Sequence, residues 1–239
     1  MDFDLSDDQR LLKDSVDRLI ADKYAFEARK KIMAEPGGWS REMWAQFAEL
    51  GLLGLPFAEA HGGFGGGPVE TMLVMEAFGR GLVLEPFLAT VILGGGLIQA
   101  AGSAEQQKAL LPQIAQGKKV IAFAQVERSS RYNLADVQTS AKKDGSGWVL
   151  NGEKSVVIAG DSADTLIVTA RTAGGRFDRA GIGLFLVDAK AAGVSIQGYP
   201  TQDGTHAAEI RFDNVRAADV LGDPAGGLAA AEAVMDQAI

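Results

Sequence analysis

The side chains that most often perform catalysis or bind metal ions are scarce in this sequence of 239 residues. It contains no cysteine, which excludes disulfides, thiolate catalysis and cysteine-ligated metals. Its two histidines, His61 and His206, lie far apart in the chain. We therefore expect no metal site, and a Ser-His-Asp triad has almost no candidate for its base. We interpret His206 as structural.

Two short motifs approach known reactive sequences without matching them. The glycine loop Gly62–Gly67 lacks G-x-G-x-x-G spacing, lacks the Lys-Ser/Thr pair of a P-loop and follows no predicted strand, so we interpret it as a turn between helices. The segment Gly160-Asp161-Ser162-Ala163-Asp164 departs from the nucleophile elbow at its final position. A hydrolase is therefore not expected.

A third segment, residues 127–131, places Arg128 and Arg131 beside the hydroxyls of Ser129 and Ser130. A guanidinium there could pair with a carboxylate or a phosphate of a ligand, because both offer two oxygens to its planar fork. A solvated loop is the third interpretation, and the residues alone leave all three open.

Helical periodicity runs through the first 118 or so residues. Gly81–Ala101 is mostly apolar, but Glu85, Pro86 and three consecutive glycines favour a buried helix over a membrane span. The predicted helix starts are the capping boxes Ser6–Gln9 and Ser103–Gln106, the cap Ser40, and the first-turn prolines Pro68 and Pro86.

From Val120 to about Val215 the chain has short runs rich in valine, isoleucine and threonine. We expect Asn151-Gly152 and Asp144–Gly147 to be hairpin turns. No helical pattern interrupts the strands, which predicts an antiparallel, barrel-like or sandwich domain. The predicted strands are Val120–Val126, Val137–Ala141, Trp148–Leu150, Ser155–Ile158, Thr165–Arg171, Ile182–Val187, Val194–Tyr199 and Ala207–Asp213.

The predicted fold class is multi-domain α+β: an all-α helical bundle (1–118), an antiparallel β-barrel-like middle domain (119–225) and the start of a C-terminal helix (226–239). That helix, Leu228–Ile239, has no C-terminal stop signal, so we expect a truncated chain. The net charge of -8 argues against nucleic acid as a partner. The N-terminus Met1-Asp2-Phe3-Asp4 has no signal-peptide features, and we expect a cytoplasmic protein without membrane partners.

The order and spacing of several motifs resemble the acyl-CoA dehydrogenase family along the whole chain. They are Leu50–Pro56, His61–Gly66, Ala101–Gly117, Ala122–Glu127, Leu150–Lys154 and Leu221-Gly222. Three further stretches resemble the pimeloyl-CoA dehydrogenase small-subunit subfamily, namely Asp161–Asp164, Gly181–Asp188 and Gly198–Gly204.

The resemblance implies a flavoprotein oxidoreductase of fatty acid metabolism that uses FAD to introduce a double bond between Cα and Cβ of an acyl-CoA. A dicarboxyl-CoA such as pimeloyl-CoA is among the candidate substrates. The family's catalytic Glu falls beyond residue 239, so no catalytic residue is named. By family position, the cofactor-binding residues are Phe123, Gln125, Val126, Val156 and Ile158, and the substrate-binding residues are Ser129, Ser130 and Arg131.

Three of those cofactor positions differ from the family pattern. Val126 replaces a threonine, Val156 a tryptophan, and Ile158 a threonine or serine. These changes keep a second hypothesis open, a non-catalytic partner subunit of a heteromeric acyl-CoA dehydrogenase. The implied partners are a homo- or hetero-oligomeric sister subunit and an electron acceptor such as an electron-transfer flavoprotein.

Overall fold

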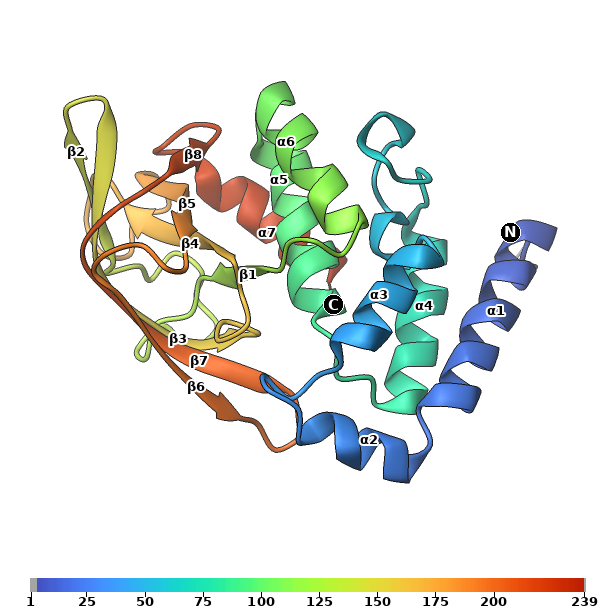
Figure 1. The fold of residues 1–239 in the computed structure, drawn as a ribbon. Coiled ribbons are helices and arrows are strands. Elements are labelled where there is room, and N and C mark those ends of the chain that lie inside the picture. The colour runs from blue at the N-terminus through green and yellow to red at the C-terminus, as the bar shows by residue number, and fades with distance from the viewer. Residues whose placement is uncertain (1–3, 239) are drawn as a thin grey trace.

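The computed structural model describes residues 4–238, and the first half of this range is helical (Figure 1). Its elements are α1 (Asp7–Lys23), α2 (Phe26–Met33), α3 (Arg41–Glu49), the short 3-10 helices η1 (Leu52–Gly54) and η2 (Glu59–His61), α4 (Pro68–Gly81), the π-helix η3 (Leu88–Gly95), α5 (Gly96–Ala101) and α6 (Ala104–Ala115). None of the helices in the described range is long and apolar enough to cross a membrane.

The predicted helix starts are confirmed at four places. Ser6 and Ser103 each accept a hydrogen bond from the backbone N–H three residues on, and each forms a complete capping box. The Ser40 side chain caps α3 by accepting a hydrogen bond from the backbone N–H of Met43. Pro68 is the first residue of α4, a position at which a backbone N–H has no partner within the helix.

The apolar segment that begins near Pro86 is not the single α-helix that we predicted. Its first part, Leu88–Gly95, is a π-helix that continues into α5. Ile121 and Phe57 pack directly against the glycines of this helix. A Cβ added to Gly94 would lie 2.9 Å from Ile121, and a Cβ added to Gly95 would lie 2.5 Å from Phe57, so neither position has room for a larger residue. Glycine is a poor α-helix former, so close contact with these neighbours can reshape the helix.

The second half of the chain is an eight-stranded, mostly antiparallel sheet, as predicted, followed by one helix (Figure 1). The strand order is β6-β7-β3-β2-β4-β5-β8, and β1 pairs with β4 in parallel. The strands are β1 (Ile121–Ala124), β2 (Ser140–Asp144), β3 (Gly147–Ile158), β4 (Thr165–Arg171), β5 (Ile182–Asp188), β6 (Val194–Pro200), β7 (His206–Arg216) and β8 (Asp219–Leu221), and the helix is α7 (Gly227–Gln237).

The prediction of a hairpin turn at Asn151-Gly152 is wrong. Both residues lie inside β3, which is one long strand, and the register with β7 shifts between Leu150 and Gly152. Gly152 has a φ of 149°, and a Cβ there would lie 2.6 Å from Cα of Thr139. The glycine therefore serves a bulge and a close backbone approach rather than a turn.

Other strand boundaries also differ from prediction. The turn at Asp144–Gly147 is confirmed, because these residues pair at the end of the β2–β3 ladder. The strand predicted at Val137–Ala141 begins instead at Ser140, and the short β8 was not predicted. The last helix ends at Gln237, and Ile239, the predicted end, lies outside the described residues.

The helical core continues into the sheet. Phe47, Phe78 and Phe87 form its aromatic centre, with Phe47 and Phe78 stacked at 4.8 Å between ring centroids. The same buried cluster includes Ile121 of β1 and Val234 of α7. The two halves of the chain therefore share a hydrophobic core, which holds β1 against η3.

Candidate functional site

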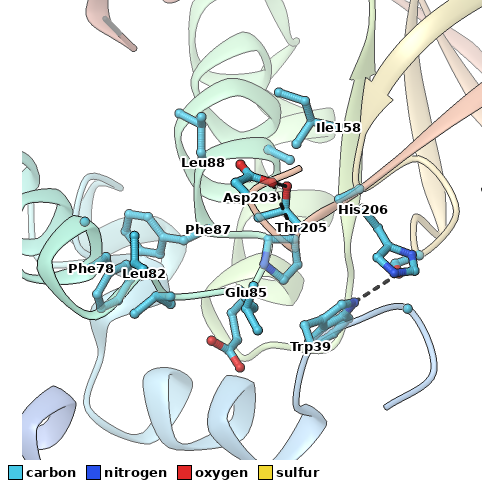
Figure 2. A pocket seen from close by; sticks show the side chains of 18 of the residues that line it. Trp39, Phe78, Leu82, Glu85, Phe87, Leu88, Ile158, Asp203, Thr205 and His206 are labelled. Carbon is cyan, nitrogen blue, oxygen red and sulfur yellow. Dashed lines mark hydrogen bonds between the residues drawn. The ribbon is translucent and has the colours of Figure 1, made fainter. Parts of the chain in front are cut away.

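A cavity of about 300 Å³ lies between the end of α4, the start of η3, the end of β3 and the start of β7 (Figure 2). Its volume is at the lower end of the range for small-molecule sites, and most of its wall is apolar. The apolar side chains come from α4, the following loop, η3 and β3: Met75, Phe78, Leu82, Phe87, Leu88 and Ile158.

Met75 and Leu88 also line a second hollow of about 630 Å³ between α4, η3 and the end of α7. The two hollows share part of a wall. Only the smaller one includes residues of β3, and one of these, Ile158, was predicted to contact a cofactor. We therefore take the smaller cavity as the candidate site.

The predicted cofactor positions come from two segments that the fold places side by side. The backbone N–H of Ser155 donates to the carbonyl of Val126 at 2.9 Å, which ties the end of β1 to β3. Gln125 and Val126 are half-buried. Val156 and Ile158 are 51% and 43% exposed. Val156 and Ile158 expose apolar surface that a flat ring could cover, and the Val126 backbone is bonded to the same strand. We call these three aliphatic residues the aliphatic ledge.

Phe123 lies elsewhere. Its side chain is buried in the helical core and is not part of the exposed ledge. Any contribution of Phe123 to a ligand site therefore has to come from its backbone or from its support of β1.

Val156 has an unusual backbone conformation. Its φ is +50°, in the left-handed region that β-branched residues rarely adopt, and the β3–β7 register shifts between Lys154 and Val157. Glu209 of β7 supports this bulge by accepting hydrogen bonds from the Ser155 hydroxyl at 2.7 Å and from the Val156 N–H at 3.4 Å. Such strain is often found at functional sites, because it aims a side chain that a regular strand would turn away.

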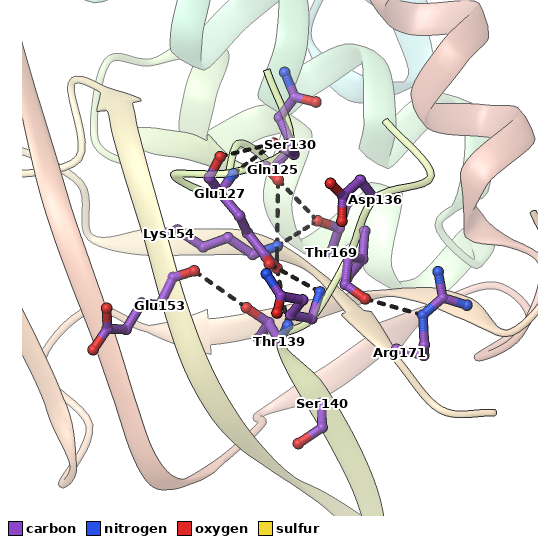
Figure 3. A network of polar contacts seen from close by, with 12 residues as sticks. Gln125, Glu127, Ser130, Asp136, Thr139, Ser140, Glu153, Lys154, Thr169 and Arg171 are labelled. Carbon is purple, nitrogen blue, oxygen red and sulfur yellow. Dashed lines mark hydrogen bonds and ion pairs between the residues drawn. The ribbon is translucent and has the colours of Figure 1, made fainter. Parts of the chain in front are cut away.

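A buried polar network lies beneath these segments (Figure 3). Lys154 is fully buried, and its Nζ lies 2.8 Å from Oε1 of Glu127. The same ammonium group donates to Oγ1 of Thr169 at 2.9 Å and to the carbonyl of Gln125 at 3.3 Å. Lys154 therefore connects the interior of the sheet to the backbone at the end of β1.

The Glu127 carboxylate is held on its other side by backbone groups. It accepts from the N–H of Gln138 at 2.8 Å and from the N–H of Thr139 at 2.9 Å. Burial by itself would raise the pKa of Glu127, but the charge of Lys154 and these hydrogen bonds outweigh it and lower the pKa. Burial lowers the pKa of Lys154 to about 8, against the opposing attraction of Glu127.

The predicted substrate residues form a turn outside the cavity. The Ser130 hydroxyl accepts from the N–H of Glu127 and donates to its carbonyl, both at 2.9 Å. Ser129 accepts from Arg176 at 2.8 Å. Arg131 is exposed with a φ of +49°, and Arg128 lies 3.8 Å from Glu209. None of Ser129, Ser130 and Arg131 lines the candidate cavity.

His206 lines the cavity, and its Nδ1 lies 2.7 Å from Oδ2 of Asp161. The nearby Ser162 hydroxyl accepts a hydrogen bond from Nε1 of Trp39 at 3.0 Å. Within residues 4–238, no hydrogen bond joins Ser162 to His206. These three side chains therefore do not form the relay of a serine hydrolase.

The structure adds three charged residues that we did not identify as site residues from the sequence, Arg29 of α2, Glu85 and Asp203. Burial raises the pKa of the Glu85 carboxyl, which binds the Tyr24 hydroxyl and the backbone N–H of Ser40. The sequence offered one indication that Glu85 could belong to a site, namely its charge within an otherwise apolar segment. No cluster of metal-binding side chains occurs in the described part of the chain.

Comparison with known proteins identifies two domains. Residues 6–118 match the acyl-CoA dehydrogenase N-terminal domain, and residues 122–215 match the acyl-CoA dehydrogenase middle domain. A probable acyl-CoA dehydrogenase, YngJ of Bacillus subtilis, is 30% identical over 234 residues, which cover 95% of this chain and 61% of that protein. The mitochondrial long-chain specific acyl-CoA dehydrogenase of Sus scrofa is 36% identical over 207 residues, covering 78% and 45%.

Solved structures agree on the fold. A variant of the Tcur3481-Tcur3483 steroid ACAD superimposes with a TM-score of 0.85 at 29% identity, covering 97% of this chain and 60% of that one. The chain thus spans about three-fifths or less of each of these relatives.

Proposed function

This chain belongs to the acyl-CoA dehydrogenase family, whose N-terminal and middle domains it carries, and we propose that its protein is an FAD-dependent acyl-CoA dehydrogenase. The observation that carries the proposal is the aliphatic ledge beside an apolar cavity, with Ile158 belonging to both. An acyl chain in the cavity would then lie next to a ring on the ledge.

The residues present fit a flavin. Val156 and Ile158 expose apolar surface toward which a ring can pack, and the half-buried segment Gln125-Val126 supplies backbone groups beside it. When bound, FAD supplies the acceptor for the hydride that leaves Cβ of the acyl chain. The three aliphatic positions provide packing without the side-chain hydroxyl or indole of the family pattern.

This chain's own residues would orient and shield the reactants. The cavity holds the acyl chain away from water, and Lys154 fixes the carbonyl of Gln125 through its buried hydrogen bond. A base must remove the α-proton, and we assign that role to no residue of this chain. Ser129, Ser130 and Arg131 stay proposed contacts for the CoA part of the substrate.

The proposed substrate and partners follow from the resemblance to the pimeloyl-CoA dehydrogenase small-subunit subfamily. We propose a dicarboxyl-CoA such as pimeloyl-CoA as substrate, an oligomer with the same or a sister subunit, an electron-transfer flavoprotein as electron acceptor, and a cytoplasmic location. The proposed domains are 1–118, 119–225 and 226–239.

A second candidate function is a non-catalytic partner subunit that binds flavin weakly or not at all. The specific observation that favours it is the aliphatic character of Val126, Val156 and Ile158. In such a subunit the aliphatic ledge would pack against other protein side chains rather than against the flavin ring.

Flavin binding separates the two functions. The full gene product, purified alone and with its candidate sister subunit, should be yellow, and adding acyl-CoA without oxygen should bleach the flavin absorbance. Ile158→Asp should reduce FAD content. Leu11→Asp, which introduces the same charge at an exposed apolar residue of α1, should not. A colourless preparation, or equal FAD content in both variants, would contradict FAD binding at this ledge and favour the partner-subunit function.

A further inference from the structure

Arg29 of α2 lines the candidate cavity and is held there by groups that do not neutralise it. Its Nε donates to the carbonyl of Leu82 at 2.7 Å, and its Nη2 donates to the carbonyl of Asp203 at 2.5 Å. Its Nη1 contacts Sδ of Met33 at 3.1 Å. These contacts fix the half-buried guanidinium between α4 and the turn that joins β6 to β7.

The guanidinium retains hydrogen-bonding capacity. Arginine has five N–H groups, and three are used in these contacts, which leaves one on each terminal nitrogen. Two adjacent N–H groups match the two oxygens of a carboxylate. Among the ion pairs of residues 4–238, none includes Arg29.

The acidic side chains of the cavity wall already have other partners. Glu85 binds the Tyr24 hydroxyl and the Ser40 N–H. Oδ1 of Asp203 accepts from the Thr201 hydroxyl at 2.5 Å, and from the Thr205 N–H at 3.0 Å and hydroxyl at 2.9 Å. Both carboxyl groups therefore accept hydrogen bonds from protein donors. Arg29, in contrast, has N–H groups that are not used in these contacts.

The remaining wall suits methylene groups. Phe78, Phe87, Leu88 and Ile158 come from the helices and from β3 and present hydrocarbon to the cavity. Figure 2 shows these side chains around the same space as Asp203, whose carbonyl accepts from Arg29. A ligand that matches this wall has an aliphatic middle and an anionic end.

We propose that Arg29 binds the terminal carboxylate of an acyl chain and so selects dicarboxyl-CoA over simple fatty acyl-CoA. This inference rests on the proposed function, and it assigns carboxylate recognition to Arg29 rather than to Arg131. Arg131 lies on the exposed turn and does not line the cavity. Arg29 is a specificity residue because it would touch the end of the substrate away from the reacting carbons.

The test compares pimeloyl-CoA with heptanoyl-CoA, which have equal chain length and differ only in the terminal group. kcat/KM is measured for the full gene product with its sister subunit, and for Arg29→Met, Arg29→Lys and the control Arg131→Met. We expect Arg29→Met to lose about 10–100-fold on pimeloyl-CoA, because an ion pair with two hydrogen bonds is removed, and less than about 3-fold on heptanoyl-CoA. Arg29→Lys should recover only part of the loss. Arg131→Met, at a proposed CoA contact, should change kcat/KM for both thioesters by the same factor and leave the preference for pimeloyl-CoA at its wild-type value.

Calorimetric binding of both thioesters to the same proteins provides a readout that needs neither flavin nor turnover. A preference for pimeloyl-CoA that disappears in Arg29→Met supports the inference even in a colourless protein. Equal losses on both substrates would mean that Arg29 only holds the domains together and would overturn it, as would a preference that is lost in Arg131→Met. Turnover of heptanoyl-CoA without any pimeloyl preference in the wild type overturns this inference alone, whereas absence of FAD and of all turnover overturns the proposed function.

Discussion

Nζ of Lys154 lies 2.8 Å from Oε1 of Glu127 in the interior of the sheet, and both side chains are almost completely buried. The ion pair is also bonded to backbone at both ends, through the carbonyl of Gln125 and the N–H groups of Gln138 and Thr139. A buried pair of this kind contributes less to net stability than to position, because desolvation offsets much of its attraction. We interpret it as the support that holds Gln125-Val126 beside β3.

Removing one member of this pair should be strongly destabilising. Lys154→Met leaves the Glu127 charge buried without its partner, and we expect the free energy of unfolding to fall by about 3–5 kcal/mol. Adding Glu127→Gln should restore about 1–3 kcal/mol, because the amide oxygen can still accept from the backbone. Urea denaturation of the wild type, Lys154→Met, Glu127→Gln and the double variant measures both values. Additive losses would show that the two side chains do not interact.

The same lysine predicts a pH dependence of stability. Burial lowers its pKa from 10.5 to about 8 in the folded chain. Between these two values the unfolded chain binds more protons, so the free energy of unfolding should rise with pH above about 8. Below about 8 the lysine is protonated in both states, and the full penalty of burying its charge is present. The difference between the wild type and Lys154→Met/Glu127→Gln, measured from pH 7 to about 9.5, should show this rise; a flat difference would contradict it.

Val156 should be one of the few strand residues whose replacement by glycine does not destabilise the chain. Its φ of +50° costs a β-branched residue about 1–2 kcal/mol, which glycine avoids. Thermal unfolding should therefore show Val156→Gly at or above the Tm of the wild type. The adjacent Val157→Gly is the control, because Val157 is buried in the sheet core and its removal should cost about 2 kcal/mol or more. Equal destabilisation by both variants would rule out strain at Val156.

Gly152 should not tolerate a methyl group. A Cβ there would lie 2.6 Å from both Cα and Oγ1 of Thr139, and β2 and β3 cannot separate without breaking their ladder. We expect Gly152→Ala to lower the free energy of unfolding by about 2–3 kcal/mol. Gly145→Ala, at a turn where a Cβ would have nothing within 4 Å, carries only the φ strain and should cost about 1 kcal/mol. If Gly152→Ala and Gly145→Ala lower the midpoint of denaturant unfolding by the same amount, the close approach of Gly152 to Thr139 does not limit the residue at this position.

Local signals predicted a large part of the fold. Capping side chains act within three residues, so Ser6, Ser40 and Ser103 are recognisable as helix starts from their immediate neighbours in the chain. Strand Thr165–Arg171 was predicted at its observed limits because its run of apolar and β-branched residues is bounded by polar ones. Asn151-Gly152 misled because the pair that favours a turn also suits a bulge, and only the neighbouring Thr139 backbone distinguishes the two.

The sequence by itself determined the class of the protein, because the order of its motifs identified the acyl-CoA dehydrogenase family and its helix caps and strand runs placed most elements. Only the tertiary structure decided which residues share a site. Arg29 and Ile158 line one cavity although they come from different domains, whereas Arg131, which lies close in sequence to the cofactor positions, is outside it. The physical reason is the distance along the chain over which each feature is set. Caps and turns depend on neighbours in the sequence, but a cavity wall depends on how a shared core packs the helices against the sheet.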